Sequence, residues 1–410
     1  MRKSLRILIV GDFLPDVGGV SQYVFNLAFS LIRSGHKVTI FHTRIGLDRD
    51  LGIFYVYRLP HSLIHMLKYV LKGSIHVLGV IRILPLVMIK PKLLLMVMLY
   101  AGRLSEIIEK TKAHIIHSNH LAIRSLVAYY LAKKRGIPCI ITAHGYDTEY
   151  PPNKLEYLIR KKCTGMANKV IVPTLWKALR VIKLYNAENI DVIPNFIPCH
   201  QLDENQLFHL KMTAKQILGY ANKFVITFIG RIIKEKGVFD IVKIARDLKV
   251  RDPNVSNKVT FIIAGAGPAE QELVESIKSS KLFDLVSYIG KIDETLKSKL
   301  LFASDIFLLL TYWTETFPMA LVEAMNHGAV PIVYYFPGVQ EILKHGEEGF
   351  ILPQSDVQGL LSVVKGLVLG EINVYQMQLK ALYRSKNFCA ERVVPSISNI
   401  YWRVLYEKHN

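Results

Sequence analysis

Cysteine is scarce in this chain of 410 residues, and its few copies are scattered. The four cysteines are Cys139, Cys163, Cys199 and Cys389, with no Cys-x-x-Cys pair and no histidine nearby at ligand spacing. This pattern argues against a zinc site and against a disulfide framework, and it fits a reducing, cytoplasmic setting. We therefore expect no metal centre.

Acidic residues are missing from a long stretch of a chain whose formal net charge is +19. None occurs between Asp50 and Glu106, where apolar runs are interrupted by basic residues and prolines. We expect none of these runs to reach the ~20 residues that cross a bilayer. Two readings remain: core helices with solvated lysines, or a basic, apolar segment lying in an anionic membrane interface. We favour the second, with the candidate membrane or acceptor contacts Lys68, Lys72, Arg82, Lys90 and Lys92.

Two other classes of protein have no support in the sequence. A basic chain can bind nucleic acid, but no recognition motif or stripe of alternating basic and aromatic residues is present, so no nucleic-acid partner is expected. The apolar run near the N-terminus ends at Gly11-Asp12, which is too short for a signal peptide. We predict that it is a buried first strand.

Strands alternate with helices in two series, which predicts an α/β protein of two Rossmann-like domains with doubly wound parallel sheets. The first series has strands at 5–10, 37–41, 114–117, 139–142, 169–172 and 190–193. The second has strands at 224–229, 260–264, 286–289 and 306–310, and 330–333 closes it. Pro194 and Pro198 interrupt regular structure between the series, which places the domains at 1–195 and 196–390. Ligands bind beyond the carboxyl ends of such strands, so we expect the domains to face a central cleft.

Two glutamates in the second series are placed to hold the two ends of one ligand. Pro318 is expected at a helix start, with Glu315 in the preceding loop and Glu323 about two turns inside the helix. The unpaired N–H groups of a helix start favour an anion between the carboxylates. This arrangement suits a nucleotide-sugar diphosphate, although two glutamates at this spacing also occur by chance.

A second candidate motif supplies cations. Arg231 and Lys236 lie in a strand-to-helix loop bounded by Gly230 and Gly237, where they could neutralise a diphosphate without a metal. A solvated charge cluster is the alternative.

The first series offers weaker candidates at the ends of its strands. Gly18-Gly19 follows the first strand, and a turn containing His144 and Asp147 follows another, as either a ligand contact or a structural turn. His117 and His120 are weaker still. Gly265-Ala-Gly267 lacks the third glycine of a dinucleotide fingerprint, which argues against an NAD enzyme.

Taken together, these motifs resemble retaining glycosyltransferases of family 4, also called glycosyl transferases group 1, which have the GT-B fold. The resemblance runs from residue 5 to about 360 with seven motifs in the family's order. They are Gly18-Gly19, His144-Gly-x-Asp147, Val192-Ile-Pro-Asn195, Gly230-Arg231…Lys236-Gly237, Gly265-x-Gly267-Pro268, Glu315-x-Phe-Pro318…Glu323 and Gly338-Val-x-Glu341. The run Tyr334-Tyr335-Phe336-Pro337 is bulkier than in similar proteins, and we expect it to narrow the donor pocket.

The resemblance implies roles for individual residues. The C-terminal domain would hold a nucleotide-diphosphate sugar, UDP- or GDP-linked, and the N-terminal domain the acceptor. A final helix at about 391–410 would pack back on the N-terminal domain. The implied catalytic residues are His144, Glu315, Arg231 and Lys236, and the implied donor-binding residues are Gly18, Gly19, Gly230, Gly265, Gly267, Met319, Ala320 and Glu323.

The expected function is therefore a metal-independent, cofactor-free hexosyltransferase (EC 2.4) that acts with retention on a hydroxyl. The basic, apolar segment favours a membrane lipid or lipid-linked glycan as acceptor, with the protein peripheral at the cytoplasmic face. The alternatives are a nucleotide-sugar epimerase, a phosphorylase and a non-catalytic component of a membrane-associated assembly.

Overall fold

The chain forms two compact units in a computed structural model that describes residues 4–14, 18–85, 88 and 90–407. Unit 1 comprises Met1–Phe196 and Ala390–Asn410, and unit 2 comprises Ile197–Cys389. The chain therefore passes from one unit to the other at 196/197 and returns at 389/390. Residues 15–17, just before the predicted Gly18-Gly19 motif, lie outside the described part of the chain.

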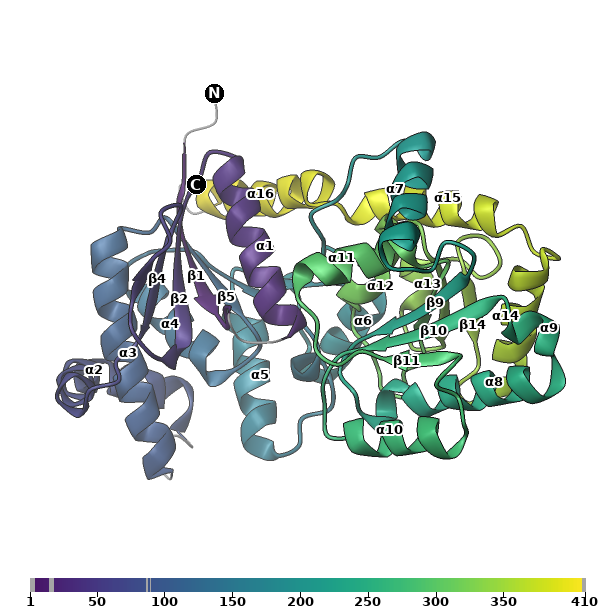
Figure 1. Cartoon of the computed structure of the whole chain (residues 1–410). Helices are drawn as coiled ribbons and strands as arrows, with labels where there is room; N and C mark the ends of the chain where they lie inside the picture. The colour runs from purple at the N-terminus through teal and green to yellow at the C-terminus, as the bar shows by residue number, and fades with distance from the viewer. Residues whose placement is uncertain (1–3, 15–17, 86–87, 89, 408–410) are drawn as a thin grey trace. The chain divides into compact units, whose positions relative to one another are not determined.

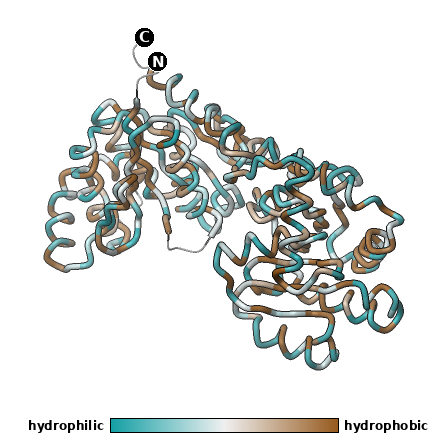
Figure 2. The backbone as a smooth tube through the Cα atoms, turned by 45° about the horizontal axis from the view of Figure 1, so that its top comes forward, coloured by the Kyte–Doolittle hydropathy of each residue, from teal (hydrophilic) through white to brown (hydrophobic). Residues whose placement is uncertain are grey.

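Unit 1 is built on an eight-stranded sheet with the order β3-β4-β2-β1-β5-β6-β7-β8, in which only the short β3 runs antiparallel to its neighbour. Isoleucine, leucine and valine fill the central strands, which are brown in Figure 2 and are buried on both faces. The strands are β1 (Arg6–Gly11), β2 (Lys37–Ile45), β3 (Arg49–Asp50), β4 (Tyr55–Leu59), β5 (Ile115–Asn119), β6 (Cys139–Thr142), β7 (Lys169–Val172) and β8 (Ile190–Val192).

Helices cover both faces of this sheet (Figure 1). They are α1 (Gly19–Arg33), α2 (Leu63–Ile83), α3 (Pro91–Thr111), α4 (Ile123–Lys134), α5 (Lys154–Met166), α6 (Leu175–Tyr185) and α16 (Ala390–Tyr406). The expected final helix is α16, and it packs against α1 with Val393, Ile397 and Tyr401 in the same core as Ile7. The ring nitrogen Nδ1 of His117 lies 2.6 Å from the Tyr401 hydroxyl, which adds a buried polar contact to this packing.

Unit 2 is built on a six-stranded, all-parallel sheet with the order β11-β10-β9-β12-β13-β14. Its strands are β9 (Phe224–Ile229), β10 (Val259–Ala264), β11 (Val286–Tyr288), β12 (Ile306–Leu309), β13 (Val330–Tyr334) and β14 (Phe350–Leu352). Its helices are α7 (Glu204–Ile217), α8 (Val238–Arg251), α9 (Pro253–Ser256), α10 (Glu270–Ser279), α11 (Glu294–Ala303), α12 (Met319–Asn326), α13 (Val339–Ile342), α14 (Val357–Leu369) and α15 (Val374–Ser385), with a 3-10 turn η3 (Lys234–Lys236). Both units therefore have the expected Rossmann-like, α/β architecture.

Several local expectations were wrong. The strand at 330–333 does not close the second series, since β14 pairs beyond it. Glu323 is the fifth residue of α12, a little over one turn from its start rather than two. We expected no apolar run of spanning length in the basic segment, yet the 21 residues of α2 are long and apolar enough to cross a membrane.

A disulfide joins Cys199 to Cys389, so the inference that the scattered cysteines argue against disulfides was wrong, and the cysteine pattern no longer supports a reducing setting. The two residues are 190 positions apart, at opposite ends of unit 2, and an isolated bridge pairs Ile197 with Cys389 beside them. The bond therefore closes unit 2 into a covalent loop, while Cys139 and Cys163 remain free and buried.

Reduction of this disulfide should destabilise unit 2. A cross-link over a long loop restricts the unfolded chain and contributes about 2–4 kcal/mol to stability. We expect dithiothreitol to lower the denaturation midpoint of the wild type. The double variant Cys199→Ser/Cys389→Ser should have a low midpoint without reductant, and dithiothreitol should not change it. Equal midpoints with and without reductant in the wild type would contradict the bond.

Candidate active site

The sheet of unit 2 has its topological switch point between β9 and β12. The chain winds from β9 to β10 and β11 and then returns to the other side of β9, so the loops after β9 and β12 diverge at adjacent carboxyl ends. Such a point is where α/β sheets bind ligands. Lys236 lies in the loop after β9 and Glu315 in the loop after β12, and their side chains form an ion pair in which both are largely buried. The structure thus brings together two of the predicted residues.

Backbone contacts hold these two loops against each other. The Tyr312 N–H donates to the Glu235 carbonyl over 2.7 Å. Gly237 adopts a φ of 70°, and a Cβ atom there would lie 2.2 Å from the Leu310 carbonyl oxygen. Only glycine therefore allows the loop with Lys236 to approach the end of β12 so closely.

The glycines after β10 have a similar structural role. A Cβ atom on Gly265 would lie 1.7 Å from the Gly230 carbonyl oxygen, and one on Gly267 would lie 2.2 Å from that of Ile232. These two glycines allow the loops after β9 and β10 to pack together. Close packing between loops is thus a sufficient reason for both, whether or not they also contact a ligand.

Glu323 pairs with a residue that the sequence did not single out. Lys297 of α11 places its Nζ atom 3.2 Å from the Glu323 carboxylate. Burial raises the pKa of Glu323 against the opposing effect of Lys297. Burial would lower the pKa of Lys297, but the carboxylates of Glu323 and Glu294 outweigh it and raise that pKa. The two side chains thus form a largely enclosed ion pair that joins α11 to α12.

The remaining predicted residues of unit 2 lie around this pair of loops. Arg231 is exposed, and its guanidinium makes no ion pair with the residues that the structure describes. Met319 and Ala320 are the first residues of α12, after Pro318 at the N-cap, so their amides belong to the free start of the helix. An arginine, a lysine and a helix start together favour an anionic ligand.

The expectation that Tyr334–Pro337 narrows the donor pocket is only partly compatible with the structure. Tyr334 and Phe336 are buried in the core. Tyr335 and Pro337 instead line a surface cavity of about 600 Å³ together with Gln354. Only alternate residues of the run thus face a space that a ligand could enter.

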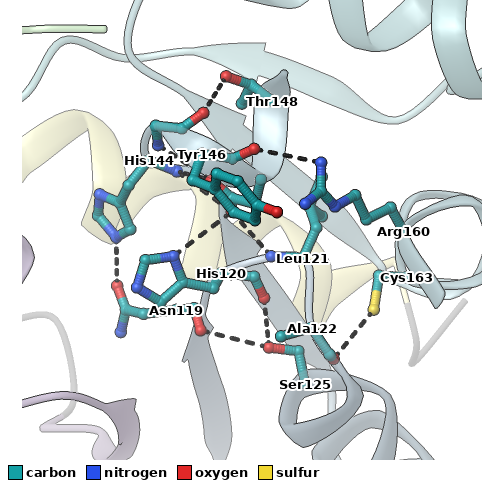
Figure 3. Close-up of polar contacts among 12 residues, drawn as sticks. Asn119, His120, Leu121, Ala122, Ser125, His144, Tyr146, Thr148, Arg160 and Cys163 are labelled. Carbon is teal, nitrogen blue, oxygen red and sulfur yellow. Dashed lines mark hydrogen bonds and ion pairs between the residues drawn. The ribbon is translucent and has the colours of Figure 1, made fainter. Parts of the chain in front are cut away.

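In unit 1, His144 follows β6 and lies against the end of β5 (Figure 3). Its Nε2 atom is 2.9 Å from Asn119 Oδ1, while Asn119 Nδ2 donates to the Val10 carbonyl. Because that carbonyl can only accept, the amide is oriented and Nε2 of His144 is the donor. Burial lowers the pKa of His144 to about 3, so the ring is neutral at physiological pH and its Nδ1 atom is an acceptor.

Asp147 is a structural residue rather than a ligand contact. Its carboxylate accepts N–H bonds from His144, Gly145 and Leu121 over 2.8–3.0 Å. Burial alone would raise its pKa, but hydrogen bonding and charge from His120, 3.7 Å away, lower it. Asp147 therefore fixes the turn that carries His144. His117, a weaker candidate, is likewise structural, buried between Tyr401 and Thr142.

A polar cluster at the carboxyl edge of this sheet was missed. Arg124, in the first turn of α4, pairs with Asp12 over 3.2 Å and contacts Thr43. Burial tends to raise the pKa of Asp12, but Arg124 and Thr43 outweigh it and lower that pKa. Asp12 follows β1 and Thr43 belongs to β2, so a search for polar residues at strand ends would have found both.

The other predicted residues of unit 1 divide into two sets. Gly18 is the N-cap of α1 and Gly19 its first residue. Of the basic candidates, Lys72 is 3.5 Å from Glu106 and is partly held by it. The others are exposed, namely Lys68, Arg82, Lys90 and Lys92.

Buried histidines should make the protein acid-sensitive. Burial lowers the pKa values of His117, His144 and His327 to about 3 from 6.5. Between pH 3 and 6.5 the unfolded chain therefore binds more protons than the folded chain. Each neutral ring contributes its full stabilisation above pH 6.5, and this contribution is lost as the pH falls below 6.5. We expect each of the three histidines to lower the free energy of unfolding by about 1 kcal/mol between pH 7 and pH 5.5.

Denaturation midpoints measured from pH 7 to 5.5 test this expectation. His117→Asn should have a shallower pH slope than the wild type, whereas the exposed His209→Asn control should keep the wild-type slope. Parallel slopes for all three proteins would exclude His117 as a source of acid sensitivity.

Two Rossmann-like units with a candidate anion site at a switch point define a GT-B protein, and solved structures agree. Sucrose-phosphate synthase from Thermosynechococcus elongatus matches with a TM-score of 0.76 over 98% of this chain and 100% of its own, at 17% identity. Anabaena HepE in complex with UDP matches with a TM-score of 0.71 over 97% and 99%, at 18% identity. These likenesses establish the fold.

The sequence establishes the family. Residues 17–201 match the family described as Glycosyltransferase Family 4, and residues 212–381 match Glycosyl transferases group 1. The chain belongs to the family 4 glycosyltransferases and is a glycosyltransferase.

Curated relatives extend over most of the chain. N-acetyl-alpha-D-glucosaminyl L-malate synthase of Bacillus anthracis is 26% identical over 76% of this chain and 80% of its own length. Alpha-monoglucosyldiacylglycerol synthase of Acholeplasma laidlawii is 26% identical over 86% of each. One subunit of the human phosphatidylinositol N-acetylglucosaminyltransferase is 27% identical over 87% of this chain and 67% of its own length.

Proposed function

We propose that this glycosyltransferase moves a sugar from a UDP- or GDP-linked donor to a hydroxyl of a membrane lipid or lipid-linked glycan, with retention and without a metal. Unit 2 would bind the donor and unit 1 the acceptor. The observation that carries the proposal is the Lys236–Glu315 ion pair at the switch point of unit 2, beside the start of α12. It supplies a cation for a diphosphate and a carboxylate for sugar hydroxyls at one place.

Donor binding would separate this ion pair. A diphosphate carries more negative charge than one carboxylate, so Lys236 would turn to it, joined by Arg231 and the amides of Met319 and Ala320. The released Glu315 carboxylate would accept hydrogen bonds from the sugar. Glu323, held by Lys297, would accept from the ribose.

The same contacts account for catalysis. When the bond between the anomeric carbon and the phosphate oxygen breaks, negative charge grows on the leaving phosphate, where fixed cations stabilise the transition state more than the ground state. The acceptor hydroxyl would attack from the face that the phosphate leaves and give its proton to a phosphate oxygen. His144 is neutral and would accept a hydrogen bond from a sugar hydroxyl through Nδ1.

The choice of acceptor rests on the relatives and on the charge of unit 1. Relatives from Acholeplasma laidlawii and humans are named for lipid acceptors, and one from Escherichia coli, 25% identical, for a diphosphoundecaprenol-linked sugar. The exposed basic residues of 68–92 favour anionic lipid at the cytoplasmic face of the membrane. A soluble hydroxy acid is the second candidate, favoured by the name of the Bacillus anthracis relative.

A product assay tests the proposal. Purified protein receives UDP- or GDP-hexoses with diacylglycerol, phosphatidylinositol, undecaprenyl-diphosphate sugar or malate, and products are identified by mass spectrometry. We expect sugar transfer and nucleotide release that both require a lipid acceptor. Nucleotide release without an acceptor would indicate an epimerase, a requirement for inorganic phosphate a phosphorylase, and no turnover a non-catalytic role.

A further inference from the structure

An exposed apolar stripe runs along α2, the 21-residue helix after β4. Ile64, Leu67, Leu71, Ile75 and Leu78 recur every three or four residues, so they share one face of the helix. Their exposed fractions are 78%, 54%, 71%, 68% and 68%. A contiguous apolar surface of this kind marks a binding site for another surface or a membrane.

The other face of α2 is fixed to α3 at very short range. A Cβ atom on Gly73 would lie 1.7 Å from the Met98 carbonyl oxygen, and one on Gly102 would lie 2.0 Å from that of Tyr69. The two backbones therefore touch where they cross, and α2 buries only the row Tyr69, Gly73, His76 and Val80. The stripe thus stays uncovered because the helix is already fixed to its neighbour.

The charged residues of α2 and of the start of α3 are all basic. Lys68 and Arg82 of α2 are exposed, as are Lys90 and Lys92 at the start of α3, and the chain has no acidic residue from 51 to 105. Met88, Leu95 and Met96 add exposed apolar side chains beside these lysines. Apolar side chains together with lysines are the chemistry that suits an anionic phospholipid interface.

We propose that α2 lies in the plane of an anionic membrane, with the stripe from Ile64 to Leu78 inserted among the acyl chains and Lys68, Arg82, Lys90 and Lys92 at the phosphates. Spanning is disfavoured although α2 is long enough. Tyr69, on the buried face of α2, hydrogen-bonds Glu106 and Arg103 of α3. A spanning α2 would have to leave α3, and the Tyr69 hydroxyl would then be unpaired in hydrocarbon. The link to a lipid acceptor rests on the proposed function; the membrane surface itself does not.

Flotation with vesicles of phosphatidylcholine, with or without 30% phosphatidylglycerol, tests the surface. Wild-type protein should float with anionic vesicles, and Leu71→Glu/Ile75→Glu should reduce partition at least tenfold. Val250→Glu, at an equally exposed valine of α8, is the matched control and should float like the wild type. Arg82→Gln/Lys92→Gln should weaken binding at low salt and less at high salt.

Measurements of insertion depth and of oligomeric state distinguish a helix at the membrane surface from a spanning helix and from a dimer interface. In Leu71→Trp, the introduced indole should be quenched by lipids brominated near the headgroup end of the acyl chain and not by lipids brominated at the bilayer centre. Central quenching would indicate a spanning helix. A concentration-dependent dimer abolished by Leu71→Glu/Ile75→Glu, with no flotation, would assign the stripe to a second copy. Either result overturns the proposal, as would flotation unaffected by that variant. Vesicles without donor or acceptor keep this test independent of turnover.

Discussion

Glu315→Gln should abolish most turnover while leaving nucleotide binding intact. The carboxylate is expected to hold sugar hydroxyls in the transition state, and removal of one such contact typically costs about 10²–10³ in kcat. In the structure the same carboxylate is paired with Lys236. Its removal frees that lysine for the diphosphate, so the dissociation constant for UDP or GDP should stay the same or fall.

Steady-state kinetics and calorimetric titration, run on one preparation, separate these two effects. Glu235→Gln removes an exposed carboxylate from the neighbouring loop and should retain wild-type kcat and affinity. If Glu315→Gln turns over at the wild-type rate, Glu315 has no catalytic role. If it loses nucleotide affinity along with turnover, the carboxylate supports the loop rather than the sugar.

Lys236→Ala should weaken donor binding and slow transfer together. A hydrogen bond to a charged group contributes about 1.5–3 kcal/mol, which corresponds to about 10–150-fold in donor affinity. Because charge on the leaving phosphate increases in the transition state, kcat should fall as well. Lys236→Arg should recover part of the donor affinity and part of kcat, since it keeps the cation.

Lys234 supplies the matched control for this variant. It lies in the same 3-10 turn, two residues away, but it is exposed and pairs with Glu272 over 2.8 Å. Lys234→Ala should therefore keep wild-type kinetics. An equal loss in both lysine variants would mean that general charge near the turn matters and that no specific contact to the diphosphate is made at Lys236.

The sequence predicted those features that depend on local pattern. The buried strands β6, β7 and β9 have the expected bounds, because runs of isoleucine and valine between turn residues leave little choice. Parallel strands then bring the loops after β9 and β12 to one edge, so Lys236 and Glu315 meet although 79 residues separate them. Topology was enough to place them.

Features that depend on partners distant in sequence were not predictable. Nothing near Cys199 marks Cys389 as its partner, and Lys297 is one of many lysines until α11 packs beside α12. The sequence predicted a membrane-surface segment but not its exposed face, because the contact of Gly73 and Gly102 between α2 and α3 decides which face is buried. The sequence left Asp147 open between a ligand contact and a structural turn, because its backbone hydrogen bonds form only in the folded turn.

Hydrogen exchange with and without UDP, GDP or ADP tests the central claim, that the donor binds at the switch point of unit 2. One nucleotide should slow exchange in two segments above all others, the loop at 230–237 and the segment 311–323, and Lys236→Ala should remove that protection. Protection that lies elsewhere, or that survives in Lys236→Ala, would contradict the assignment of the donor site to Lys236 and Glu315.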